Sequence, residues 1–135
     1  MILMIQSFQR YTLSILRIIA SFTFCLHGLV KVFGMFGGLG GHGASAPPWS
    51  LFWVAGVLEA GGGVLLLLGI FTRSVAFILC GEMAVAYFTQ HFPQGFWPVS
   101  NGGELAVLYC FLFLYLFTAG PGHWSLDSLI WKKGT

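Results

Sequence analysis

The 135-residue chain is 57% hydrophobic and only 7% charged, with a formal net charge of +2. Soluble globular domains carry about 25% charged residues, so this composition excludes a soluble domain and indicates an integral membrane protein. A helical span needs roughly 20 apolar residues, so the length allows at most about four or five spans and no separate soluble domain. The six basic residues are scattered and form no basic patch, which excludes nucleic acid as a partner.

Four long apolar runs follow one another along the chain, each bounded by glycine, proline or charged residues. They predict spanning helices over residues 11–35, 50–70, 73–92 and 103–119. Glycine, proline and small polar residues predict loops at 37–48 and 93–103. Only Thr72 and Arg73 separate the second and third runs, which predicts a tight hairpin there. The predicted fold is an all-α, four-helix transmembrane bundle in a single domain, residues 1–135.

The tail after the Gly120-Pro121-Gly122 stop carries apolar residues at helical spacing. Ser125 precedes them in the position of a helix N-cap. We therefore expect a short C-terminal helix that lies along the membrane interface.

The basic residues predict the orientation of the chain in the membrane. In a four-span arrangement, five of them fall on one side, and the two long loops contain none: Arg10, Arg17, Arg73, Lys132 and Lys133. Because cytoplasmic segments are enriched in Lys and Arg, both termini are predicted to be cytoplasmic.

Five ionisable residues fall inside or at the mouth of the predicted spans: His27, Lys31, Glu59, Glu82 and Glu104. Each ionised group at bilayer depth costs on the order of 2.5 kcal/mol, so these side chains should face the bundle and find partners. Lys31 follows His27 by four positions and so shares its helix face. All five are predicted to converge in the outer half of one bundle.

Two interpretations of this cluster stay open. It is either a set of structural ion pairs and hydrogen bonds, or a polar pocket for a small molecule such as a proton-coupled redox carrier. Carboxylates and histidine are also metal ligands, but no Glu-x-x-His pair of the carboxylate-bundle kind occurs. The sequence does not identify a cofactor: a quinone would suit the cluster, and nothing indicates haem or a metal.

The cysteines Cys25, Cys80 and Cys110 are each isolated within an apolar run, and there is no Cys-x-x-Cys. Such cysteines are usually small buried hydrophobic residues. Their spacing argues against a membrane thiol–disulfide oxidoreductase. Small residues around Glu59, among them Gly56 and Gly63, predict close helix packing.

The linked motifs of the chain resemble those of the DoxX family of small membrane proteins. They are His27-Gly28 with Lys31, Gly56-Val57-Leu58-Glu59, Gly81-Glu82-Met83-Ala84 and Asn101-Gly102-Gly103-Glu104. The resemblance implies a four-helix bundle in the inner membrane of a bacterial or archaeal cell, and a link to quinone-dependent oxidation and oxidative-stress complexes. Since most members have no assigned reaction, the resemblance carries over no catalytic residue.

The leading hypothesis is a subunit or small-molecule-binding component of a membrane redox system. His27 and Lys31 would donate hydrogen bonds to a quinone-like carbonyl, while Glu59 or Glu82 would exchange a proton. The chain has no visible electron carrier, so an oxidoreductase activity would need a partner protein. We therefore expect a homo-oligomer or a subunit of a larger complex in the lipid bilayer. The alternative is a structural or assembly subunit with no ligand chemistry of its own.

Overall fold

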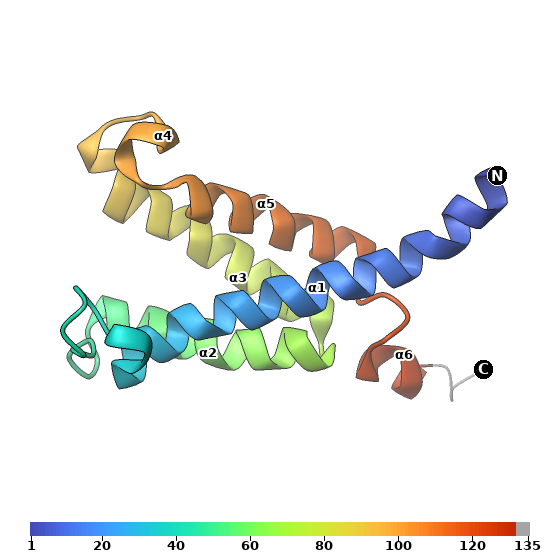
Figure 1. Cartoon of the computed structure of the whole chain (residues 1–135), viewed down its shortest axis with the longest axis horizontal. Coiled ribbons are helices and arrows are strands. Elements are labelled where there is room, and N and C mark those ends of the chain that lie inside the picture. The colour runs from blue at the N-terminus through green and yellow to red at the C-terminus, as the bar shows by residue number, and fades with distance from the viewer. Residues whose placement is uncertain (132–135) are drawn as a thin grey trace. The chain divides into compact units, whose positions relative to one another are not determined.

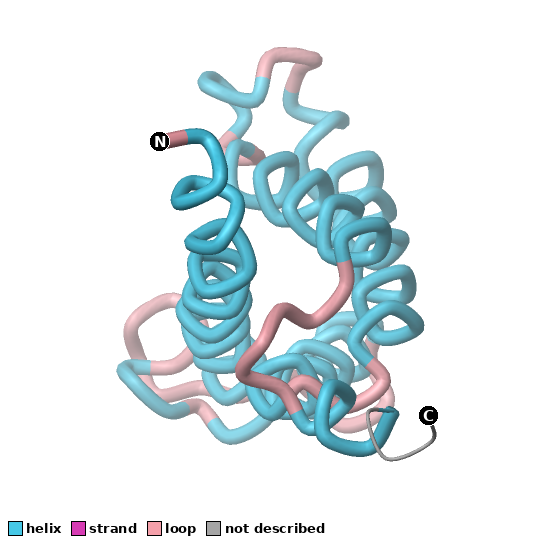
Figure 2. The backbone as a smooth tube through the Cα atoms, turned by 90° about the vertical axis from the view of Figure 1, so that its right-hand side faces the viewer, coloured by secondary structure: helices cyan, strands magenta, loops and turns pink. Residues whose placement is uncertain are grey.

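The computed structural model describes residues 1–131, and all regular structure in that range is helical apart from one isolated bridge between Leu39 and Ala44 (Figure 2). This confirms the predicted all-α class. The labelled helices of Figure 1 are α1 (Ile2–Phe33), α2 (Leu51–Leu68), α3 (Thr72–Ala86), α4 (Pro98–Asn101), α5 (Glu104–Ala119) and α6 (Leu126–Trp131).

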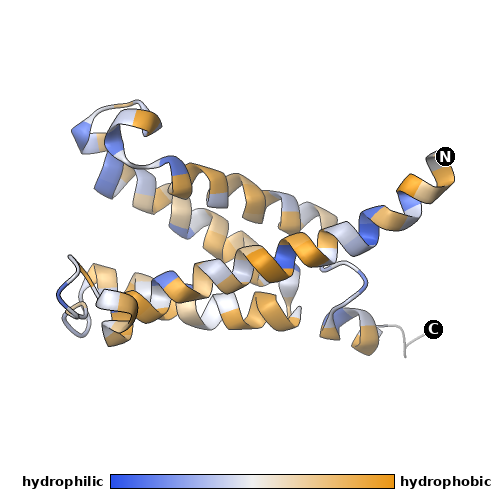
Figure 3. Ribbon diagram, viewed as in Figure 1, coloured by the Kyte–Doolittle hydropathy of each residue, from blue (hydrophilic) through white to orange (hydrophobic). Residues whose placement is uncertain are grey.

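Three helical stretches of the described chain are long and apolar enough to cross a membrane: Leu3–Phe33, Leu51–Leu68 and Thr72–Gln94. Helix α5 is apolar but has 16 residues. At 1.5 Å per residue it is about 24 Å long, less than the roughly 30 Å of a hydrocarbon core. Figure 3 shows hydrophobic residues covering most of the long helices. The chain therefore has three candidate spans by length and composition, and the fourth span stays a prediction.

The ends of α1 and α2 follow from local capping. Helix α1 begins at Ile2, well before the predicted start at residue 11, because no glycine or proline interrupts the first turns. It ends at Gly34, which adopts a left-handed conformation (φ 67°) and donates its N–H to the Val30 carbonyl at 3.0 Å. At the start of α2, the Ser50 hydroxyl accepts the Trp53 N–H at 3.2 Å.

The third apolar run does not continue as a regular helix to residue 92. After α3 the chain forms a π-helical turn (Tyr87–His91) and a 3₁₀ turn (Phe92–Gln94). The predicted loop 93–103 is wrong in part, because it contains α4. Pro98 stands in the first turn of this short helix, where its missing N–H costs no hydrogen bond.

The chain divides into two compact units, residues 1–72 with the segment from Pro121 onward, and residues 73–120. In the first unit α1 packs along α2 (Figure 1). A Cβ added at Gly56 would lie 2.7 Å from the Lys31 Cβ, and one at Gly63 would lie 2.8 Å from the Cys25 Cβ. The glycines of α2 therefore permit the close helix contact that the sequence predicted.

The C-terminal segment is bound to the first unit by side chains. The Ser125 hydroxyl accepts the Ser128 N–H at 3.1 Å, which confirms the predicted N-cap of α6. The Asp127 carboxylate accepts the backbone N–H groups of Phe71 and Thr72, each at 2.9 Å. These contacts fix the tail to the turn that follows α2.

Arg17 of α1 also binds the tail. Its side chain is fully buried, and its guanidinium donates hydrogen bonds to the backbone carbonyls of Pro121 and Trp124. In the sequence this residue served only as a marker of the cytoplasmic end of α1. Its burial means that the tail completes the fold of the first unit.

The second unit is built from α3 to α5. The rings of Phe77 and Phe117 lie 5.3 Å apart, and the Arg73 guanidinium donates to the carbonyls of Phe117 and Thr118 at 2.7 and 2.5 Å. These contacts join the start of α3 to the end of α5. Helix α5 ends at Ala119, before the predicted Gly-Pro-Gly stop.

Candidate functional site

Lys31 of α1 and Glu59 of α2 form an ion pair in the first unit. The Lys31 Nζ lies 2.6 Å from the Glu59 Oε1, and the exposed fraction of the side chain is 22% for Lys31 and 3% for Glu59. A carboxylate buried this deeply in an apolar protein needs a charged partner to be tolerated. The structure thus brings together two of the five residues singled out in the sequence.

The second carboxylate oxygen of Glu59 is the chemically distinctive atom of this pair. It is buried, and it has no hydrogen-bond partner among the described residues. A buried acceptor left unpaired costs on the order of 1–3 kcal/mol. Oε2 is therefore an atom at which a bound molecule or a proton would relieve an existing cost.

His27 lies one helical turn before Lys31 and is exposed. It interacts electrostatically with the Glu59 carboxylate. Burial therefore increases along the three side chains: His27 is exposed, Lys31 is half-buried and Glu59 is buried.

The two other predicted site residues belong to the second unit. Glu82 lies on α3 and is half-buried, whereas Glu104 is the first residue of α5 and is exposed. Their convergence with His27, Lys31 and Glu59 stays a prediction from the sequence.

The remaining histidines do not join these three side chains. Within residues 1–131 no group of three or more His, Cys, Asp or Glu side chains could hold a metal ion. His42 is exposed. In a sequence reading, His123 near the tail is most simply exposed as well, but it is half-buried, and its ring stacks on Tyr11 at 5.1 Å. In the second unit, the His91 Nδ1 lies 3.1 Å from the Asn101 carbonyl oxygen.

Sequence reasoning missed a polar network around Asn101 in the second unit. The Asn101 amide donates to the Gly95 carbonyl at 2.7 Å and to the Tyr87 hydroxyl at 3.3 Å, and its side-chain oxygen accepts the Gly103 N–H at 2.8 Å. Asn101 is only 5% exposed, so it holds the segment between α3 and α5 together. The sequence signal is that Asn101 opens the Asn101-Gly102-Gly103-Glu104 motif, although this motif names none of its hydrogen-bond partners but Gly103.

Two cysteines that are isolated in the sequence meet in space. The sulfur atoms of Cys80 on α3 and Cys110 on α5 lie 3.7 Å apart, while the Cys25 thiol donates to the Ala60 carbonyl in the first unit. All three are free thiols and half-buried. The argument against thiol chemistry from sequence spacing alone therefore does not extend to Cys80 and Cys110.

Comparison with known proteins gives a consistent result. The sequence model of the DoxX family matches residues 12–92, a range that contains His27, Lys31, Glu59 and Glu82. An "Uncharacterized protein" of Haemophilus influenzae is 46% identical over 96% of this chain and 98% of its own length. "Putative oxidoreductase CatD" of Bacillus subtilis is 30% identical over 94% of this chain and 92% of its own length.

A further relative is named for its location. "Inner membrane protein YqjF" of Escherichia coli is 30% identical over 87% of this chain and 90% of its own length. No solved structure matches the chain.

Proposed function

Because the chain belongs to the DoxX family of membrane proteins, we propose that it is a subunit of a membrane redox system that binds a quinone-like carbonyl compound at His27, Lys31 and Glu59. The observation that carries the proposal is the buried Glu59 carboxylate, which has one oxygen without a hydrogen-bond partner. Its other oxygen pairs with Lys31, whose side chain is partly exposed. The name of the Bacillus subtilis relative supports the redox class.

The residues present fit such a ligand. A quinone, when bound, supplies two-electron and two-proton carbonyl chemistry. The Lys31 ammonium is partly exposed while it bonds the Glu59 Oε1, so it can donate to a carbonyl oxygen without losing its counter-charge. His27 provides a second donor one helical turn away.

Proton supply follows from the same three side chains. Lys31 and His27 hold protons that a carbonyl oxygen takes up on reduction, as general acids. Glu59 balances the charge of Lys31, and its Oε2 accepts a proton that enters the site. Glu82 remains a second proton-exchanging candidate from the sequence. The electrons come from a partner protein, which makes this chain one subunit of a complex.

The experiment is quantification of the quinone that copurifies with the wild type and with Glu59→Gln in mild detergent. Gln keeps the size of Glu59 and one hydrogen-bonding oxygen but cannot exchange a proton. The expected result is a folded yield close to wild type with about tenfold less quinone per folded protein, the effect of one charge-assisted hydrogen bond. Ser21→Ala is the control, because Ser21 is buried on α1, the helix that carries Lys31, but bonds only carbonyls of its own helix.

The alternative is a structural or assembly subunit, favoured by the packing of Gly56 directly against Lys31. In that case Glu59→Gln lowers the folded yield, while any quinone that copurifies stays at wild-type occupancy per folded protein. That outcome, or a wild type that carries no quinone, would overturn the proposed site.

A further inference from the structure

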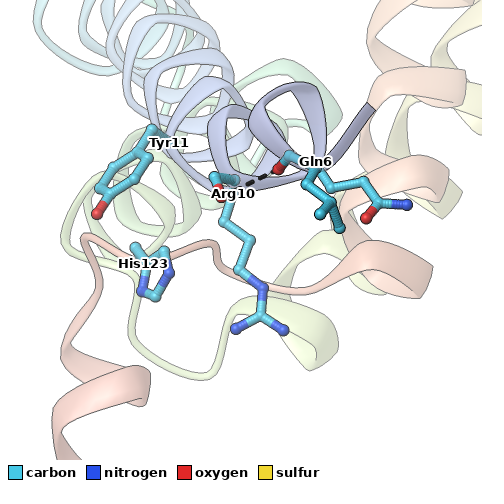
Figure 4. A pocket seen from close by; sticks show the side chains of 6 residues that line it. Gln6, Arg10, Tyr11 and His123 are labelled. Carbon is cyan, nitrogen blue, oxygen red and sulfur yellow. Dashed lines mark hydrogen bonds between the residues drawn. The ribbon is translucent and has the colours of Figure 1, made fainter. Parts of the chain in front are cut away.

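A cavity of about 430 Å³ lies in the first unit near the N-terminal end of α1, far along this helix from Lys31. Its lining comprises Leu3, Gln6, Ser7, Arg10, Tyr11 and His123. Figure 4 shows Arg10 between the labelled side chains of Gln6 and His123, with its guanidinium extending away from the α1 backbone. No acidic residue lines the cavity, so its charge is positive.

Arg10 differs from the two other arginines of the described chain. The guanidinium groups of Arg17 and Arg73 both donate hydrogen bonds to backbone carbonyls. For the Arg10 guanidinium, no hydrogen bond or ion pair is found within residues 1–131. Five N–H donors of a planar, permanently charged group are therefore available at this cavity.

His123, which comes from the tail, lines the cavity opposite the residues of α1, and contacts between the tail and α1 hold it there. The His123 backbone N–H approaches the Arg10 carbonyl at 3.5 Å, and the His123 ring stacks on Tyr11 with an interplanar angle of 28°. The imidazole and the Gln6 amide offer further donors beside the guanidinium. The cavity thus combines one permanently charged side chain with polar groups on two sides.

The length of α1 indicates where along the membrane normal this cavity lies. Its 32 residues extend about 48 Å, whereas the hydrocarbon core is roughly 30 Å thick. Because α1 is longer than the core, its first turns, in which Gln6, Ser7 and Arg10 stand among exposed apolar side chains, can extend into the headgroup region. Tyr11 also contacts Trp124, with ring centroids 5.6 Å apart, and Tyr and Trp side chains are enriched at the membrane–water interface.

We propose that this cavity binds a phosphate group through Arg10, assisted by His123 and Gln6, and that the phosphate belongs to an anionic membrane lipid. The guanidinium fork matches the geometry of two phosphate oxygens, which favours an oxyanion such as phosphate over a simple halide. The site is separate from the Lys31–Glu59 pair and does not depend on the proposed redox function.

The test is native mass spectrometry of the full chain in nanodiscs of phosphatidylcholine with a fixed fraction of phosphatidylglycerol. The wild type should retain phosphatidylglycerol in preference to phosphatidylcholine. Arg10→Gln should reduce the retained phosphatidylglycerol about tenfold, the effect of losing a charged donor pair. Arg10→Lys keeps the charge but loses the fork, so it should fall between the two. Arg73→Gln is the matched control and should retain lipid like the wild type.

A second arm identifies the source of the phosphate. Inorganic phosphate added to the wild type should leave phosphatidylglycerol bound, whereas displacement at millimolar concentration would overturn the lipid assignment. The site itself is overturned if Arg10→Gln retains as much phosphatidylglycerol as the wild type. The same holds if Arg73→Gln loses as much lipid as Arg10→Gln while both show wild-type helicity by circular dichroism.

Discussion

Arg17 and Lys31 are two cations on the same helix of the first unit, and their surroundings differ in kind. Arg17 is fully buried and bonds backbone carbonyls, which cannot change their charge. Lys31 is partly exposed and bonds Glu59, whose second oxygen is buried without a partner. The position of a charge in an apolar protein therefore does not reveal its role. The partner does: backbone carbonyls hold Arg17 in place, whereas a carboxylate with a spare oxygen gives Lys31 the means for proton exchange.

The largest effect should come from Arg17→Ala. This change leaves a cavity and deprives two carbonyls of their donors, so the free energy of unfolding should fall by about 4 kcal/mol. Thermal unfolding in detergent, followed by circular dichroism, measures the loss. Arg10→Gln on the exposed face of the same helix serves as the control and should change stability by less than about 0.5 kcal/mol. Equal losses in the two variants would remove the distinction between the two arginines.

Lys31→Met should cost about 3 kcal/mol, because it leaves the Glu59 carboxylate buried without a counter-charge. Adding Glu59→Gln should recover most of that loss, since the double variant has no buried charge. The double-mutant cycle is measured by the same thermal unfolding. If the two losses simply add, the pair is not coupled in the way that the 2.6 Å contact requires.

Asp127→Asn should have a smaller effect on the Arg17 end of the unit. The Asp127 carboxylate accepts two backbone N–H groups, and an amide can accept only at its single oxygen. We expect a loss of about 1 kcal/mol, comparable with the loss of a helix cap. Glu104→Gln removes an exposed carboxylate from the first turn of α5 and is the control. A loss in the control that matches the loss in Asp127→Asn would contradict the capping role.

The last prediction places the two ends of α1 on opposite sides of the membrane, the N-terminal end beyond Arg17 and the C-terminal end beyond Lys31, and involves no change in stability. A cysteine replacing Ser45, in the loop beyond Lys31, should react with an impermeant thiol reagent from outside intact cells. A cysteine replacing Gln9, near Arg17, should react only after permeabilisation. The wild type, with its three native cysteines, gives the background. Labelling of Gln9→Cys alone in intact cells would reverse the predicted orientation.

The sequence predicted the features that depend on neighbouring residues. Ser125 was identified as an N-cap and Gly120 as a helix stop because both signals are local. The burial of Arg17 was not predicted, because its partners are carbonyls more than a hundred residues away and carbonyls carry no residue-specific signal. The π-helical turn from Tyr87 was also missed, since its stabilising contacts with Asn101 come from another element.

The candidate site divides in the same way. The sequence predicted that Lys31 would find partners among the ionisable residues of the spans, because an unpaired charge there is costly, but it did not single out Glu59 from Glu82 and Glu104 as the partner. The spare oxygen of Glu59 could not be foreseen, because it depends on how closely α1 and α2 pack. The Arg10 cavity forms only because the tail packs against α1, and the hydrophobic pattern of the sequence does not predict that contact.

The bond between Arg17 and the Pro121 carbonyl also sets an order of events during synthesis. The two residues are 104 positions apart, so the arginine leaves the ribosome long before its acceptor exists. At usual translation speeds this interval lasts on the order of 5 to 20 s. During that time α1 carries an unpaired cation and depends on water or lipid phosphate at the membrane surface. We therefore expect α1 to reach its final depth in the membrane late in synthesis, once the residues around Pro121 have been made.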